Sequence, residues 1–298
     1  MIHKIYIGFA ILILGILITG IVSQDRSKLQ PNLEETLPVW NDYQSTELLA
    51  TMENDMAKKE SDSSLTSTEK VPDCTKLFPN LYTVYESPVK TEEKKKIAYL
   101  TFDDGPSENT FKVLDLLEKL DVKATFFIVG SSIDDGGEDC LKRMVNEGHT
   151  IGIHTYSHLC NEIYCSIERY LDDFNTVYLQ IHDITGEWVN IYRFPLGSNN
   201  KYSKGIKDAL MEEMDRRGFS CYDWNVSADD SLGRPTAYSI RHNIQKDLRR
   251  FDRPIILMHD SIINDLTVQT LPDIIKMISD YGYEFDTLDH REPYQFNW

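Results

Sequence analysis

Five short segments, far apart in the chain, carry polar residues directly after stretches that the sequence predicts to be buried strands. The segments are Thr101–Pro106, His154–His158, Arg193–Gly197, Asp223–Asp230 and Leu257–Asp260. They bring carboxylates, imidazoles and a guanidinium to the ends of strands. In a parallel α/β barrel the carboxyl ends of the strands meet at one rim, where active sites lie. The pattern therefore predicts such a barrel with a polar site at its rim.

Apolar strand-like runs alternate with amphipathic stretches from residue 97 onward. The strands expected are Ile97–Phe102, Ala124–Val129, Thr150–His154, Asn190–Phe194, Phe219–Trp224, Pro254–His259 and Tyr283–Leu288. The helices expected between them are Phe111–Leu120, Cys140–Glu147, Ile167–Ile184, Gly205–Arg217, Tyr238–Phe251 and Leu271–Tyr281. Because the strands are continuous apolar runs, both faces of the sheet should be covered. We predict an α/β fold, a distorted (β/α)7-8 barrel with parallel strands. An open doubly wound sheet is the alternative, although the sequence lacks the Gly-x-Gly-x-x-Gly turn of dinucleotide-binding sheets.

The N-terminal residues predict attachment to a membrane or export across it. Residues 5–22 are an uncharged, mostly apolar run of about 18 residues, the lower edge of what spans a bilayer. We predict a membrane anchor or signal segment over 1–23. An uncleaved anchor is favoured over a cleaved signal, because Ile21 is a poor substitute for the small residue of a cleavage site. The rest of the chain is then extracellular, either held at the cell membrane by a single span or secreted.

Two further regions follow the apolar run. Residues 24–73 are rich in acidic and small polar residues and have few clustered aliphatic ones, which predicts a flexible acidic stalk. Residues 74–298 have the length of one domain and contain all five polar segments. The whole chain has a formal net charge of −17, which argues against nucleic acid as a partner. We expect a monomer.

The chain has five cysteines, an odd number that leaves at least one free thiol in a monomer. Outside the cell, Cys160 and Cys165 could form a disulfide that pins the loop after His158. Two free, partly buried thiols are the alternative. Cys221 lies inside an expected strand and is predicted to belong to the core.

Four polar residues predict a metal site at the rim. His154 and His158 are four residues apart, a spacing that puts both imidazoles on one side of a helical turn. Asp103 and Asp104 are adjacent at a strand end, where two carboxylates repel each other unless a cation neutralises one. A capping role for Asp104 is the alternative, because a helix is expected to start near Ser107. Two histidines and one aspartate leave positions open for water, as in catalytic sites. Nitrogen and oxygen donors suit zinc, but also cobalt, nickel or manganese.

The five segments resemble, in content and in order, the five motifs of the polysaccharide deacetylase family. These are carbohydrate esterases with a nodulation-factor-deacetylase-type catalytic domain. The resemblance covers Ile97 to Leu288 and extends to three other segments, Ala124–Gly130, Glu147–Gly152 and Gly282–Leu288. It implies a metal-dependent hydrolase that removes N-acetyl groups from a polymer, by attack of a metal-bound water on the acetamide carbonyl.

The resemblance also implies a role for each polar residue. The implied ligands of one divalent metal are Asp104, His154 and His158. Asp103 is then the general base, and Arg193 orients it through a fork-like pair. His259 is the general acid that protonates the leaving amine, although a histidine after an apolar strand is by itself more typical of the core. Asp230 is the acid that hydrogen-bonds His259 and raises its pKa.

The substrate contacts implied by the resemblance are less complete. Leu196 stands where an aromatic residue is common, and the backbone N–H of this residue stabilises the oxyanion. Trp224 and Leu257 match the apolar walls around the acetyl methyl group. Ser231 replaces a tryptophan that many members have directly after the aspartate, which alters one wall of the groove.

We predict de-N-acetylation of N-acetylglucosamine in peptidoglycan, because a membrane anchor and a stalk place a hydrolase near the cell wall. The alternatives among enzymes are a chitooligosaccharide deacetylase, an N-acetylmuramic acid deacetylase and an acetylxylan esterase. A catalytically silent wall-binding module is the alternative from another class.

Overall fold

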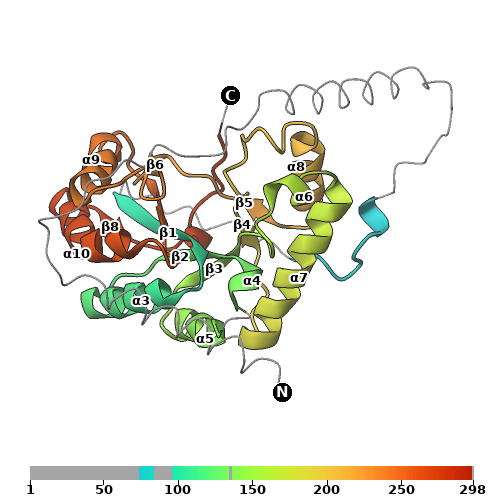
Figure 1. The fold of residues 1–298 in the computed structure, drawn as a ribbon, viewed down its shortest axis with the longest axis horizontal. Helices are drawn as coiled ribbons and strands as arrows, with labels where there is room; N and C mark the ends of the chain where they lie inside the picture. The colour runs from blue at the N-terminus through green and yellow to red at the C-terminus, as the bar shows by residue number, and fades with distance from the viewer. Residues whose placement is uncertain (1–73, 84–95, 134–135, 297–298) are drawn as a thin grey trace, which may run out of the picture. The chain divides into compact units, whose positions relative to one another are not determined.

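One sheet of eight parallel strands forms the centre of the fold, which is a computed structural model that describes residues 74–83, 96–133 and 136–296 (Figure 1). The strands are β1 (Ile97–Gly105), β2 (Thr125–Ile128), β3 (Thr150–Ile153), β4 (Ile191–Tyr192), β5 (Ser220–Cys221), β6 (Val226–Ser227), β7 (Ile255–His259) and β8 (Glu284–Phe285). Their order is β5-β4-β3-β2-β1-β7-β6, and β8 pairs with the first two residues of β1.

This strand order is that of a barrel interrupted between β5 and β6. Going around the sheet, each strand lies next to its neighbour in sequence, apart from the β5–β6 break and the placement of β8 against β1. A doubly wound sheet would reverse its order at a switch point, and no reversal of that kind occurs among the described strands. The predicted parallel barrel is thus confirmed as a curled sheet that is open on one side.

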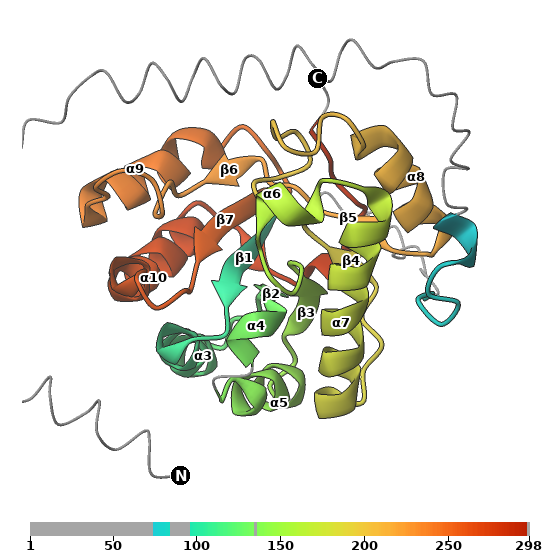
Figure 2. The ribbon, with the colours of Figure 1, turned by 45° about the vertical axis from the view of Figure 1, so that its right-hand side comes forward.

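Helices cover the outside of the curled sheet (Figure 2). They are α3 (Glu108–Leu120), α4 (Gly130–Ile133), α5 (Glu138–Asn146), α6 (Cys160–Ile163), α7 (Ile167–Thr185), α8 (Lys207–Arg216), α9 (Ala237–Leu248) and α10 (Asp265–Asp280), with short 3₁₀ turns at Cys74–Lys76 and Leu288–His290. α7 lies where the amphipathic stretch Ile167–Ile184 predicted a helix, and its Leu171, Phe174 and Ile181 are buried. The helix begins after Ser166, whose side chain accepts a hydrogen bond from the Arg169 N–H, and ends at Gly186 with φ of 79°.

Some elements differ from the sequence-based prediction. β6 was not expected, because two residues are too short to show an apolar pattern. α10 begins at Asp265, well before the expected start at Leu271, and keeps Pro272 inside the helix. Proline is disfavoured in a helix interior, so this longer helix departs from the general rule. α4 and α6 were not expected either, since each is only one turn long.

The inner side of the sheet carries an apolar layer directly below the polar rim. Tyr99, Phe127, Ile191, Tyr222, Ile255 and Leu288 form this cluster. Side chains alternate along a strand, so Tyr99, Thr101 and Asp103 of β1 point to the same side. The same alternation places His259 two residues beyond Leu257 on the inner side of β7. The rim residues therefore lie directly above a layer of buried apolar side chains.

Arg217 fastens the segment 74–83 to the domain. Its guanidinium is fully buried and donates to the carbonyl oxygens of Cys74, Leu77, Phe78 and Leu81. It also donates to Glu213 Oε1 over 2.8 Å. The first residues of the described domain are thus held by one buried cation.

The remaining sequence-based expectations have different outcomes. The anchor (1–23) and the stalk (24–73) lie outside the described residues. Within the described ranges, no helix is both long enough and apolar enough to cross a membrane. Cys160 and Cys165 are both free thiols; Cys160 is partly buried, as in the second of the two alternatives, whereas Cys165 is exposed. Cys221 is buried in the core as predicted.

Candidate metal centre and active site

Asp104, His154 and His158 offer three ligand atoms that lie within 4.8 Å of one another at the rim. Asp104 Oδ1 is 3.6 Å from His154 Nε2 and 3.4 Å from His158 Nε2. Asp104 ends β1, and both histidines follow β3, the second neighbour of β1 in the sheet. The predicted cluster is brought together. The histidines lie in a loop rather than on the helical turn that their spacing suggested.

The surroundings of these three side chains suit a cation. The imidazole of His154 is held by its Nδ1, which lies 2.9 Å from the carbonyl oxygen of Arg193. A carbonyl only accepts, so Nδ1 carries the proton and the Nε2 lone pair faces the cluster. Burial lowers the pKa of His154, which keeps the ring in the neutral form that a metal requires.

Asp104 itself gives the clearest fit to a metal. Its Oδ1 is buried, and no hydrogen-bond donor to it is found among the described residues. A buried acceptor without a donor is costly, and a cation at this point would satisfy it. The capping alternative for Asp104 is wrong, because Ser107 caps α3 and its side chain accepts from the Asn109 N–H.

Asp103 lies beside the cluster and is oriented from the opposite side by Arg193. Arg193 Nη1 donates to Asp103 Oδ1 over 2.7 Å, and both side chains are buried. The other Asp103 oxygen, Oδ2, is 3.8 Å from His154 Nε2. The contact uses one guanidinium nitrogen and not the expected fork. Arg193 Nε donates to the carbonyl oxygen of Tyr222 and Nη2 to that of Asp223. Nη1 also donates to Thr101 Oγ1.

His259 ends β7, and Asp230 holds it in two ways. His259 Nδ1 lies 2.8 Å from Asp230 Oδ1, and the His259 N–H donates to Asp230 Oδ2 over 2.8 Å. Burial acts to lower the pKa of His259, but the Asp230 contact and the nearby Asp103 and Asp104 outweigh it and raise the pKa to about 9. The imidazole is therefore protonated at neutral pH, and its Nε2 carries a proton that it can donate.

The predicted substrate contacts lie around this core with different exposures. Leu257 is buried on β7 opposite Thr101 of β1. Trp224 is partly buried, with its ring 5.7 Å from the Arg193 guanidinium carbon. The Leu196 side chain is 55% exposed, and among the described residues its N–H donates to no backbone or side-chain acceptor. That N–H is therefore available to a ligand.

The loops of the site carry most of the backbone strain in the described part of the chain. Seven residues other than glycine have positive φ there. Five of them are at the site: Asp104 near the end of β1, and Thr155, His158, Leu196 and Asp229 in the loops. Such conformations cost about 1–3 kcal/mol each and gather at functional sites. The loop strain supports a site in which backbone geometry was selected for side-chain placement.

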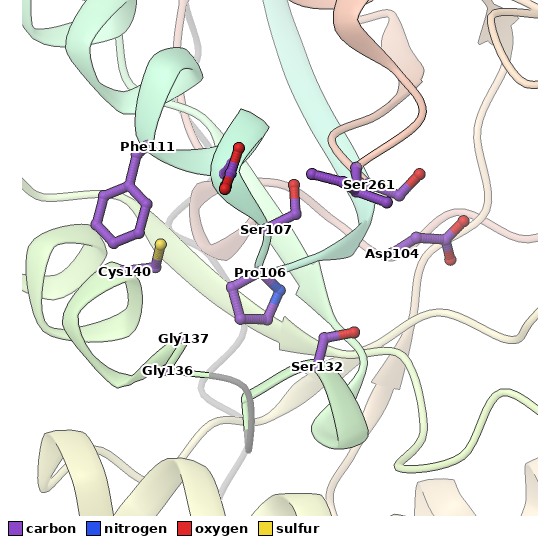
Figure 3. A pocket seen from close by; sticks show the side chains of 11 residues that line it. Asp104, Pro106, Ser107, Phe111, Ser132, Gly136, Gly137, Cys140 and Ser261 are labelled. Carbon is purple, nitrogen blue, oxygen red and sulfur yellow. The ribbon is translucent and has the colours of Figure 1, made fainter. Parts of the chain in front are cut away.

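A pocket of about 410 Å³ has Asp104 at one end (Figure 3), and neither His154 nor His158 lines it. Pro106 and Ser107 form its middle, and Phe111 and Cys140 its far end. Ser132 and Ser261 add hydroxyl groups, and Ile262 lines it as well. The pocket leaves out the acid and the base, so it adjoins the reacting centre and does not contain it.

Several residues that shape the site have no role in the sequence-based prediction. Thr101 accepts from Arg193, and Thr267 donates to Asp230 Oδ2 over 2.7 Å. Asp223 is fully buried and holds the loop after Leu196 through Ser198. Phe296, near the end of the chain, packs against Trp224. Thr101 and Asp223 could have been found from the sequence, because both lie at strand ends. No sequence pattern indicated Thr267 or Phe296.

A family model, curated relatives and solved structures all indicate the same family for this chain. Residues 90–213 match the family model described as polysaccharide deacetylase. A peptidoglycan-N-acetylglucosamine deacetylase of Bacillus cereus is 31% identical over 210 residues, which cover 69% of this chain and 74% of that protein. A peptidoglycan-N-acetylmuramic acid deacetylase of Bacillus subtilis is 32% identical over 227 residues, which cover 73% and 80%.

A solved structure agrees with this likeness in sequence. The catalytic domain of a peptidoglycan N-acetylglucosamine deacetylase from Eubacterium rectale superimposes with a TM-score of 0.66 at 33% identity, covering 71% of this chain and 96% of that one. The fold, the rim cluster and the relatives lead to one conclusion: the chain belongs to the polysaccharide deacetylase family, hydrolases that act on the amide bonds of N-acetylated sugars.

Proposed function

We propose that this protein is a metal-dependent de-N-acetylase that acts on N-acetylglucosamine in peptidoglycan. The observation that carries the proposal is the arrangement at the rim. A three-residue ligand set, Asp104 with His154 and His158, lies beside Asp103, a carboxylate that Arg193 orients. The protonated His259 is the register partner of Asp103 on the neighbouring strand β7. A hydrolase of acetamides needs these three parts together.

The ligand set would hold one divalent ion, for which zinc is the first choice. Cobalt, nickel and manganese accept the same nitrogen and oxygen donors. The orphaned Oδ1 of Asp104 and the neutral Nε2 of His154 support this assignment. When bound, the ion supplies Lewis-acid chemistry, which polarises an acyl oxygen and lowers the pKa of water.

Asp103 serves as the general base in this proposal. Arg193 fixes its Oδ1, so Oδ2 is left to accept a proton from the attacking water. The buried guanidinium lies 4.1 Å from the centre of the Phe127 ring and makes four hydrogen bonds with its surroundings. Such a cation holds the base in one orientation throughout the reaction.

His259 serves as the general acid at the end of the reaction. An amine leaves an amide only when its nitrogen is protonated, and His259 Nε2 carries the proton for this step. Asp230 keeps the ring charged and fixes its orientation through Nδ1. The free N–H of Leu196 would donate to the oxyanion, and Trp224 and Leu257 would enclose the acetyl methyl group.

The choice of peptidoglycan rests on the relatives and on the N-terminal residues. The Bacillus cereus and Eubacterium rectale proteins are both named peptidoglycan N-acetylglucosamine deacetylases. The apolar run at residues 5–22 would anchor the chain at the outer face of the cell membrane, with residues 24–73 as a stalk. Comparing membrane fractions of cells that express the full chain, or the chain without residues 1–23, tests this location. A chain that stays in the membrane without residues 1–23 would contradict it.

N-Acetylmuramic acid is the second candidate substrate, because the Bacillus subtilis relative is named for it. Incubating the purified protein with peptidoglycan and separating the muropeptides by mass spectrometry distinguishes the two sugars. We expect the loss of acetyl groups from glucosamine. Loss from muramic acid would support the second candidate. Acetate release from acetylated xylan or chitooligosaccharides alone would redirect the function to those polymers, and no release from any of them would contradict the proposal.

A further inference from the structure

The C-terminal segment crosses the loops that follow β4 and β5. Tyr294 forms a parallel bridge with Tyr222, and the Asp223 N–H donates to Tyr294 O over 2.7 Å. The Tyr222 hydroxyl donates to the carbonyl oxygen of Arg291 over 2.5 Å. The segment therefore adds to the sheet beyond β5, on the side where the barrel is open.

Asp223 connects this segment to the loop that carries Leu196. Its Oδ1 accepts from the Ser198 N–H over 2.8 Å, and its Oδ2 accepts from both Ser198 Oγ and the Phe296 N–H. The carboxylate is fully buried and has three donors. A buried carboxylate is tolerated only when its oxygens are hydrogen-bonded, so the three elements are held as one unit.

Phe296 packs on the proposed acyl wall as a result of this connection. Its ring meets the Trp224 ring edge to face, with centroids 5.1 Å apart and planes at 84°. Gly197 lies under both rings, because a Cβ at that position would come within 3.0 Å of a Phe296 ring atom and of a Trp224 ring atom. The three residues form a close contact, and a side chain at Gly197 would crowd both rings and strain a backbone with φ of 78°.

We propose that Phe296 is a positioning residue for the acyl group of the substrate, acting through Trp224. The indole contacts the Phe296 ring and also lies 5.7 Å from the Arg193 guanidinium carbon. Leu196 is more than half exposed and leaves this wall without a ring from its own loop. The C-terminal segment supplies the missing aromatic support, and it fixes the size of the space that receives the acetyl methyl group. This inference rests on the proposed deacetylase site.

The test compares an acetyl substrate with a larger one. Release of acetate and of propionate is measured on N-acetyl- and N-propionyl-glucosamine oligomers, with the full chain and three variants. Phe296→Ala removes the ring, and Phe296→Tyr keeps its edge against Trp224. Tyr238→Ala is the matched control, because Tyr238 is an aromatic side chain on α9 that is 69% exposed. Thermal unfolding of each variant is followed in parallel.

A fixed wall should discriminate against the added methylene by about tenfold or more in kcat/KM. Phe296→Ala should lower this discrimination by about threefold to tenfold, the range expected for an aromatic contact, while Phe296→Tyr restores it. Tyr238→Ala should leave it unchanged.

A Phe296→Ala protein that unfolds at a lower temperature but keeps the full acetyl-to-propionyl ratio would overturn the inference, because its role is then structural. A wild-type protein that releases neither acid would overturn the proposed function instead.

Discussion

Arg193 and Asp103 form a buried ion pair in which Nη1 and Oδ1 are 2.7 Å apart. Arg193 is fixed by Tyr222, Thr101 and Asp223, so the pair is connected to β1, β4 and the loop after β5. The pair sets the direction of the second Asp103 oxygen. In the proposed mechanism this ion pair, more than the presence of two adjacent aspartates, is what assigns the role of base to Asp103.

Arg193→Lys should lower the rate of acetate release by about 100-fold, because a lysine cannot keep several of these contacts and the general base loses its orientation. The metal content should stay near one ion per chain, since no ligand changes. Steady-state kinetics with metal analysis checks both. A rate within twofold of the wild type would show that Asp103 needs no orientation.

Asp230→Asn should move the alkaline limit of activity. The pKa of His259 lies at about 9 in the folded protein, against an ordinary value of 6.5, so the acid is protonated at neutral pH and is lost as the pH rises through 9. Without Asp230, burial lowers the pKa of His259 and only the nearby Asp103 and Asp104 act against it, so the limit should fall toward 6.5. Rate profiles in kcat on an N-acetylglucosamine oligomer measure this shift. An unchanged alkaline limit would contradict the claim that Asp230 raises the pKa of His259.

The same charge contributes to stability in a defined direction. A group whose pKa is raised on folding stabilises the fold below its ordinary pKa, and that stabilisation is lost as the pH rises through the folded value. The free energy of unfolding of the wild type should therefore fall between about pH 6.5 and 9 by more than that of Asp230→Asn. Urea titrations across this range test the sign. An equal pH dependence in both proteins would contradict it.

Removal of metal should abolish activity and lower the unfolding temperature. A ligand present at 100 times its dissociation constant stabilises a protein by about 2.7 kcal/mol. His158→Ala should show the same two losses without a chelator. His242→Ala, an exposed histidine on α9, is the control and should show neither. A chelated protein with full activity would contradict the metal assignment.

Arg217→Met should destabilise the domain while leaving the site intact. The change deletes a buried cation that holds segment 74–83 and leaves Glu213 with one donor fewer, which costs about 3–5 kcal/mol. The neighbouring Arg216 also pairs with Glu213 but is 37% exposed, so Arg216→Met should cost only about 0.2–1 kcal/mol. Denaturant unfolding compares the two. An equal decrease in the free energy of unfolding in both variants would show that burial of the Arg217–Glu213 pair does not affect stability.

The sequence predicted the parts of this protein that depend on local pattern. Continuous apolar runs marked seven of the eight strands, and polar residues at strand ends marked the rim. Parallel strands bring their carboxyl ends together, so Asp104 and His154 could be assigned to one site without knowing the loops. The amphipathic stretch Ile167–Ile184 marked α7 in the same way.

The rest depends on contacts between segments far apart in the chain, which a local pattern does not contain. The Phe296 N–H donates to Asp223, and this places its ring against Trp224. The Thr267 hydroxyl on α10 donates to Asp230. The loop conformation of His158, with φ of 55°, was misread as helical because spacing alone does not distinguish a helical turn from a strained loop. The two-residue strand β6 is defined by its partner β7, not by its own residues.

Asp103→Asn is the most direct test of the central claim, that a metal held by Asp104, His154 and His158 works with a separate carboxylate base. Acetate release from N-acetylglucosamine oligomers and bound metal are measured on the same sample. We predict a loss of rate of about 100- to 10,000-fold, with the wild-type metal content retained. Full activity in this variant, or loss of the metal along with the rate, would contradict the division of roles between the two aspartates.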